Sequence, residues 1–145
     1  FFSKQGRHVV CGGTTSKITA RYLGKEIVAA PDYSDPSIPP TASIEGVDLV
    51  TEGVITIARV LDYAKNYLED NSLFEKWGKQ KDGASEIALQ LLQEATDINL
   101  FGGKAQNDAH QDANLNISFS IKLKIVDELR QCLEDMGKTV TVNYF

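Results

Sequence analysis

The sequence lacks long apolar runs and has no excess of positive charge. None of its apolar runs approaches the roughly 20 residues that a membrane helix needs. The formal net charge of −5 disfavours a broad binding surface for nucleic acid or for an anionic membrane. We therefore expect a cytoplasmic protein that contacts neither nucleic acid nor membrane.

Cysteine and histidine are scarce, with two of each. Two cysteines, Cys11 and Cys132, give no disulfide framework. His8 and His110 lack clustered carboxylates, so no zinc signature is present. Because His8 is three residues before Cys11 on one predicted strand, the two side chains point to opposite faces, and we interpret Cys11 as a core residue. We expect no metal and no cofactor.

Three nucleotide and nucleophile motifs are also missing. The chain has no Gly-Lys-Ser/Thr of a Walker A loop and no Gly-x-Gly-x-x-Gly dinucleotide fingerprint. It has no Gly-x-Ser-x-Gly nucleophile elbow. These absences lower the odds of an ATP-binding, NAD-binding or serine-hydrolase function.

The elements that are present predict one α/β domain spanning residues 1–145. Short apolar runs at 7–11, 26–30, 47–50, 98–101 and 139–145 predict strands, and helical spacing follows at 14–23, 54–68, 82–92 and 121–133. Residues 31–46 hold every proline of the chain and predict an extended loop without regular structure. Residues 69–82 predict a polar surface excursion whose apolar residues, Leu73, Phe74 and Trp77, pack back onto the domain, and residues 104–117 predict an irregular polar loop. Strands separated by helices predict a three-layer, Rossmann-like sandwich with a mostly parallel sheet of about five strands.

Three predicted strands end in glycine-bearing segments. In an open parallel sheet, ligands bind beyond the carboxyl ends of the strands, so we expect one polar crevice there. The candidate binding residues fall into three groups: Gly12, Gly13, Thr14, Thr15 and Ser16; Thr51, Glu52 and Gly53; Gly102, Gly103 and Lys104, with His110 reaching in from the following loop.

The segment from Gly12 to Ser16 is the most informative. Glycines let a ligand approach the backbone closely, and the start of the next helix presents unpaired N–H groups with a partial positive charge. Three hydroxyl groups add donors, which suits a phosphate or a carboxylate. The alternative is a tight turn in which Thr14 or Thr15 only caps the helix.

Several phrases of the sequence carry a family resemblance. In chain order they are VVCGGTT (9–15), DPSIPP (35–40), IEGVDLVTEGV (44–54), DGA (82–84) and NDAHQ (107–111). They resemble the C-terminal segment of bacterial SpoIIE-type phosphatases of the protein phosphatase 2C class, a group often found beside hydrogenase genes. Within the last phrase Asp108, and two residues after it Ala113, stand where that group has prolines.

The resemblance implies an accessory domain rather than the catalytic one. In that family the phosphatase domain lies N-terminal to this segment, and its metal-binding aspartates have no counterpart here. We therefore expect a regulatory, ligand-binding fragment of a longer serine/threonine phosphatase, with that domain as its partner. The opening Phe1-Phe2 without an initiator methionine fits a fragment. A weaker likeness links the strand, Gly-Thr-Thr and helix unit to sugar-phosphate-binding domains of DeoR-type repressors and of isomerase and CoA-transferase-like relatives.

Two other functions stay open at this point. One is a small enzyme acting on a phosphorylated metabolite or acyl compound, with Glu52 and His110 as acid–base groups. The other is a protein-docking domain, or a homodimer, that uses the proline-rich loop and Trp77 as its contact surface.

Overall fold

The computed structural model describes residues 1–30, 37–102 and 113–144, with the backbone alone for 113–119. The elements, in chain order, are β1 (Val9–Cys11), α1 (Gly13–Leu23), β2 (Val28–Ala29), β3 (Ala42–Ser43), β4 (Leu49–Thr51), α2 (Val54–Glu69), α3 (Phe74–Trp77), α4 (Gly83–Ala88), the π-helical η1 (Leu89–Glu94), β5 (Asp97–Gly102), α5 (Ala113–Asp135) and β6 (Thr139–Tyr144). The predicted α/β class is confirmed.

The described strands form two sheets rather than one parallel sheet of five. A four-stranded mixed sheet has the order β1-β4-β3-β2, and a two-stranded sheet joins β5 to β6. The pairs β1–β4 and β5–β6 are parallel, as predicted, with Cys11 opposite Thr51 and Gly102 opposite Tyr144. The pairs β2–β3 and β3–β4 are antiparallel.

The antiparallel part corrects the prediction of a loop without regular structure over residues 31–46. The prolines all precede Thr41, so none removes a backbone donor from β3. Ala42 pairs with Val50 of β4, and Ser43 pairs with Val28 of β2. The strand β2 lies inside the run predicted at 26–30, whereas β3 is two residues long, too short for an alternating apolar pattern to reveal it.

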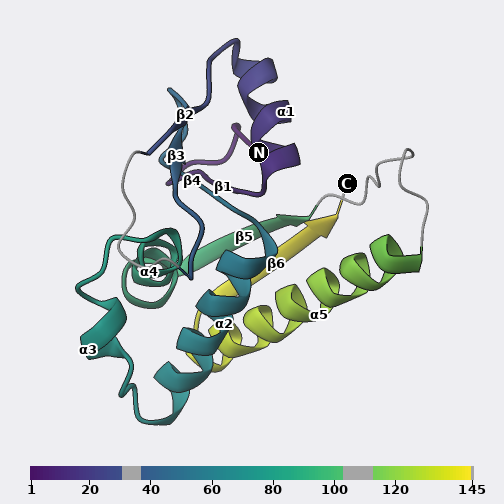
Figure 1. The fold of residues 1–145 in the computed structure, drawn as a ribbon. Helices are drawn as coiled ribbons and strands as arrows, with labels where there is room; N and C mark the ends of the chain where they lie inside the picture. The colour runs from purple at the N-terminus through teal and green to yellow at the C-terminus, as the bar shows by residue number, and fades with distance from the viewer. Residues whose placement is uncertain (31–36, 103–112, 145) are drawn as a thin grey trace.

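Helices lie on both sides of the four-stranded sheet (Figure 1). Along β4 the side chains alternate: Leu49 packs into the large core with α2, α4 and α5, whereas Val50 packs into a small cluster with Ala20 of α1 and Ile44. The chain therefore leaves β1 toward one side of the sheet through α1 and leaves β4 toward the other side through α2.

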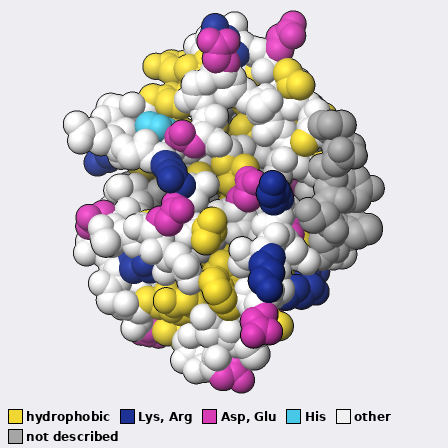
Figure 2. Space-filling view, turned by 90° about the vertical axis from the view of Figure 1, so that its left-hand side faces the viewer, with side chains coloured by type: hydrophobic (Ala, Val, Ile, Leu, Met, Phe, Trp, Pro, Cys, Tyr) yellow, Lys and Arg dark blue, Asp and Glu magenta, His cyan; other side chains and the backbone are white. Residues whose placement is uncertain are grey.

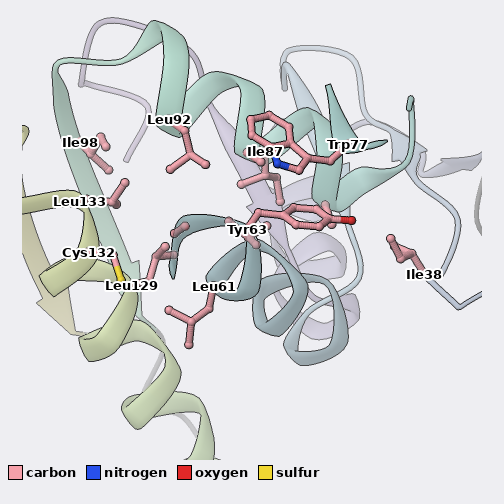
Figure 3. Packing of buried hydrophobic residues seen from close by; sticks show 14 of the residues in the cluster. Ile38, Leu61, Tyr63, Trp77, Ile87, Leu92, Ile98, Leu129, Cys132 and Leu133 are labelled. Carbon is pink, nitrogen blue, oxygen red and sulfur yellow. The ribbon is translucent and has the colours of Figure 1, made fainter. Parts of the chain in front are cut away.

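The segment at 69–82 contributes apolar side chains to the large core. Trp77 is 1 % exposed and packs edge-on against Phe74 and face-on against Tyr63 of α2. Figure 3 shows Trp77 and Tyr63 beside Ile87, with Ile38 beyond the hydroxyl end of Tyr63. The prediction that these apolar residues pack back onto the domain is confirmed, with a short helix at α3. Trp77 is therefore unavailable as a contact surface.

Capping residues fix several helix ends. Gly24 ends α1 in a left-handed conformation, and Gly137 follows α5 with a φ of 90°. Asp82 caps α4 by accepting a hydrogen bond from the Ser85 amide at 2.9 Å. The loop predicted at 104–117 is shorter than expected, because α5 already begins at Ala113.

One face of the molecule shows acidic and basic side chains interspersed, with hydrophobic side chains gathered between them in its lower half (Figure 2). Within the described ranges, no helix is both long and apolar enough to span a bilayer.

Candidate functional site

The ends of β1 and β4 bring two glycine turns into backbone contact. The Gly12 amide donates to the Thr51 carbonyl at 2.9 Å, and a Cβ built on Gly53 would lie 3.3 Å from the Gly12 Cα. Gly12 has φ 109° and ψ 142°, a conformation open in practice only to glycine. A side chain at position 53 would therefore press on the Gly12 backbone.

A cavity of about 290 Å³ opens where these turns meet. It lies between the start of α1, the start of α2 and the N-terminal half of α5. Its lining consists of Cys11, Gly12, Gly13, Thr14, Thr15, Glu52, Gly53, Val54, Ile57, Lys122, Ile125 and Val126. This is the carboxyl end of two parallel strands whose helices leave to opposite sides, the position at which open α/β sheets bind ligands.

The start of α1 leaves polar groups without protein partners. Its N-cap residue, Gly12, has no side chain, and the Gly12 carbonyl accepts from the amide of Ser16 at 2.9 Å and from its hydroxyl at 2.6 Å. In the described part of the chain, the amides of Gly13, Thr14 and Thr15 meet no acceptor, and the hydroxyls of both threonines make no hydrogen bond. The expected capping by Thr14 or Thr15 is therefore absent.

The start of α2 is arranged differently. Glu52 turns its carboxylate back onto the helix and accepts from the Thr56 amide at 3.0 Å and from the Thr56 hydroxyl at 3.2 Å. The chain thus supplies its own carboxylate to the partial positive charge of α2. This contact gives Glu52 a structural function at the same cavity.

Two further side chains define the electrostatics of the cavity. The Lys122 ammonium makes no ion pair or hydrogen bond with a described residue. Burial raises the pKa of the Cys11 thiol; a hydrogen bond with Thr51 and the charge of Lys122 act in the opposite direction, and the charge of Glu52 adds to the rise. Burial therefore favours the protonated thiol, and Cys11 packs against the large core, in agreement with its interpretation as a core residue.

Six of the predicted residues line the cavity: Gly12, Gly13, Thr14, Thr15, Glu52 and Gly53. Three others do not. Ser16 is buried. The Thr51 hydroxyl donates to the Glu52 carbonyl at 2.8 Å. A Cβ built on Gly102 would lie 2.7 Å from the ring of Tyr144, so this glycine packs against β6. Gly103, Lys104 and His110 lie outside the described residues.

Sequence reasoning missed Lys122 and its apolar neighbours on α5. Lys122 lies 70 residues after Glu52, inside a helix whose apolar spacing predicts only a core contact. His8, the other histidine, packs against Phe1 and Phe2, and its Nδ1 lies 4.0 Å from the Asp48 carboxylate. It forms no pair with Cys11, in agreement with the prediction from strand geometry.

The described residues contain no group of three histidine, cysteine, aspartate or glutamate side chains placed to hold a metal ion. Comparison with family models, with curated proteins and with solved structures gives no match to this chain.

Proposed function

We propose that this chain is an accessory domain that binds a small anion at the start of α1 and regulates a SpoIIE-type phosphatase domain in the same polypeptide. One observation supports the binding site above all: among the described residues, three amides and two hydroxyls of this helix start have no partner, and the residues that carry them line a cavity together with Lys122. The phosphatase connection and the cytoplasmic location rest on the sequence alone.

The charges of the cavity favour moderate rather than tight anion binding. Lys122 and Glu52 are the two charged residues in its lining, and their formal charges cancel. The remaining attraction comes from the amides and the dipole of α1, an arrangement that binds phosphate in many α/β proteins. The Glu52 charge is partly compensated because its carboxylate already caps α2.

Calorimetric titration of the whole chain with inorganic phosphate tests the site. We expect binding that weakens about tenfold in the double variant Thr14→Val/Thr15→Val, since each lost hydroxyl removes a hydrogen bond to a charged group. A matched control, Thr139→Val/Thr141→Val, changes two exposed threonines of β6 and should bind as the parent does. The proposal fails if phosphate does not bind, or if both double variants bind equally.

The Glu52→Gln variant separates this proposal from the enzyme alternative. Glutamine keeps an oxygen that can accept from Thr56, so the α2 cap survives while the negative charge is removed. A binding domain should then hold phosphate several times more tightly. An enzyme that uses Glu52 as a base would instead lose turnover of a phosphorylated metabolite or acyl substrate.

Regulation is tested in a polypeptide that joins this chain to a SpoIIE-type catalytic domain. Phosphate should change turnover there, and Thr14→Val/Thr15→Val should remove the phosphate effect while leaving basal turnover intact. A phosphate response identical in the two proteins would show that the effect arises elsewhere.

We also propose that β1 and β5 lie next to each other, so that the two sheets form one continuous layer in the order β2-β3-β4-β1-β5-β6. Val9 of β1 and Leu100 of β5 pack against the same core, and the Phe1 ring meets Phe101 at 5.7 Å between centroids. This order would give the predicted Rossmann-like sandwich, in which β4, β1, β5 and β6 are four consecutive parallel strands. Amide-to-amide nuclear Overhauser contacts between β1 and β5 would establish it, and their absence would refute it.

A further inference from the structure

The cavity has an apolar wall opposite the start of α1. This wall consists of Val54 and Ile57 on α2 together with Ile125 and Val126 on α5. Ile57 and Ile125 also pack against the large core, so the core holds the wall in place. Val54 remains 40 % exposed. A bare inorganic anion would leave this apolar surface in contact with water.

The apolar surface continues beyond the cavity. Ile121 lies one helical turn before Ile125 on the same face of α5 and is 47 % exposed. An organic group that starts between α2 and α5 could therefore extend toward Ile121. Burying apolar surface in this way is favourable by roughly 25 cal/mol per Å².

The size of the cavity also favours an organic ligand. Its volume of about 290 Å³ is near the lower limit of pockets that hold small organic molecules. The donors suit a phosphate better than a carboxylate, because the three amides on α1 and the Lys122 ammonium on α5 come from two separate elements, and the oxygens of a phosphate point to more sides than those of a planar carboxylate. A phosphate monoester presents three terminal oxygens and a fourth that continues into an organic group.

We propose that the ligand of this cavity is a phosphate monoester with an apolar organic group, whose phosphate faces Thr14 and Lys122 while the organic group lies on the apolar wall. This inference rests on the proposed anion site and adds the chemical class of the ligand. Phenyl phosphate is a suitable probe, because it joins the phosphate to a ring without hydroxyl groups.

Calorimetry of the whole chain compares phenyl phosphate with inorganic phosphate, ribose 5-phosphate and benzoate. We expect phenyl phosphate to bind at least about tenfold more tightly than inorganic phosphate, because its ring removes apolar surface from water. Benzoate carries the same ring on a carboxylate, and ribose 5-phosphate carries the phosphate on a polar group. Both should bind more weakly than phenyl phosphate.

The double variant Val54→Thr/Val126→Thr tests the wall itself with side chains of nearly unchanged shape. It should lose about tenfold in affinity for phenyl phosphate but keep its affinity for inorganic phosphate, since hydroxyls replace methyl groups only on the wall. The control Val28→Thr alters an exposed valine of β2 and should change neither affinity. Thermal unfolding of each variant shows that it remains folded.

The outcomes distinguish the two proposals. If inorganic phosphate binds and phenyl phosphate binds no more tightly, the apolar ligand is refuted and the anion site stands. If benzoate binds as tightly as phenyl phosphate, the phosphate class is refuted. If no anion binds at all, the anion site fails, and the ligand class fails with it.

Discussion

The starts of α1 and α2 differ in one respect although they lie side by side at the same cavity. Each follows a parallel strand and a glycine, and each has a glycine as its N-cap residue. At α2 the preceding residue is Glu52, which caps the helix with its carboxylate. At α1 the preceding residue is Cys11, which cannot do so. A helix start without an anion of its own is therefore open to an anion from solution.

A third helix start completes the comparison. At α4, Asp82 accepts from the Ser85 amide and from the Ser85 hydroxyl, both at 2.9 Å. Two of the three helix starts thus hold a carboxylate supplied by the chain. In the described structure, α1 is the helix of these three whose partial positive charge faces a cavity uncompensated.

The largest expected effect comes from the turn that forms the open start. Gly12→Ala should destabilise the domain by about 1–3 kcal/mol, because φ 109° is strained for any residue with a Cβ. Chemical denaturation measures this change. Gly13→Ala is the matched control: it is the first residue of α1 and nothing lies within 4 Å of an added Cβ. It should be neutral or stabilise by about 0.4–1 kcal/mol. Equal losses in both variants would contradict the assigned turn geometry.

The second effect compares the two caps directly. Glu52→Ala removes both contacts to Thr56 and should cost about 0.5–2 kcal/mol of folding free energy. The Thr14→Val/Thr15→Val variant removes hydroxyls that make no hydrogen bond with a described residue, so its stability should change by less than about 0.5 kcal/mol. Denaturation midpoints of the two variants, measured in phosphate-free buffer, compare their losses of stability. A larger loss for the threonine variant would show that α1 is capped after all.

The sequence predicts much of this arrangement because local patterns determine it. Apolar runs ended by glycine locate β1, β4 and β5, and strand parallelism then brings Gly12 and Gly53 to one edge. The sequence does not show that α1 lacks a side-chain cap. Thr14 and Thr15 are ordinary capping residues, and they are displaced from that position only because Gly12 is the N-cap residue.

The remaining features depend on packing between distant segments. The β3 strand has two residues and exists through its pairing with β4 and β2, which no local pattern predicts. Lys122 reaches the cavity because α5 packs against α2, and the helical periodicity of α5 does not reveal which of its lysines faces a site. Residues 103, 104 and 110 lie outside the described residues, so their predicted function in binding stays a prediction.

The third prediction concerns a substitution that adds a carboxylate to the start of α1. Thr15 occupies the third position of α1, so Thr15→Glu places a carboxylate near the open amides. It should stabilise the domain by about 0.3–1 kcal/mol and abolish phosphate binding, because the new side chain occupies the site. Thr15→Gln is the control: it has nearly the same shape without the charge, and it should gain no comparable stability. Tight phosphate binding by the glutamate variant would place the anion elsewhere.

The smallest expected effect concerns α4, where Glu86 lies in the first turn of a helix that Asp82 already caps. Burial, with the Asp82 charge as the next cause, raises the pKa of Glu86 above its ordinary value of 4.5; Lys81 acts in the opposite direction. A pKa raised by folding means that the folded state prefers the protonated acid. The contribution of Glu86 to stability is therefore fully present below the unfolded-state pKa and is lost as the pH rises through the folded-state pKa.

Glu86→Gln should consequently stabilise the domain at pH 7 and leave its stability unchanged well below the ordinary glutamate pKa of 4.5, where both side chains are neutral. Urea midpoints at neutral and acidic pH measure the difference. Glu26→Gln, at an exposed position before β2, controls for the change in net charge. If both variants gain the same stability at pH 7, long-range charge rather than the burial of Glu86 beside Asp82 is the cause. A gain confined to Glu86→Gln would show that burial, together with the neighbouring Asp82 carboxylate, makes the charged form of Glu86 unfavourable at a helix start that already holds a carboxylate of the chain.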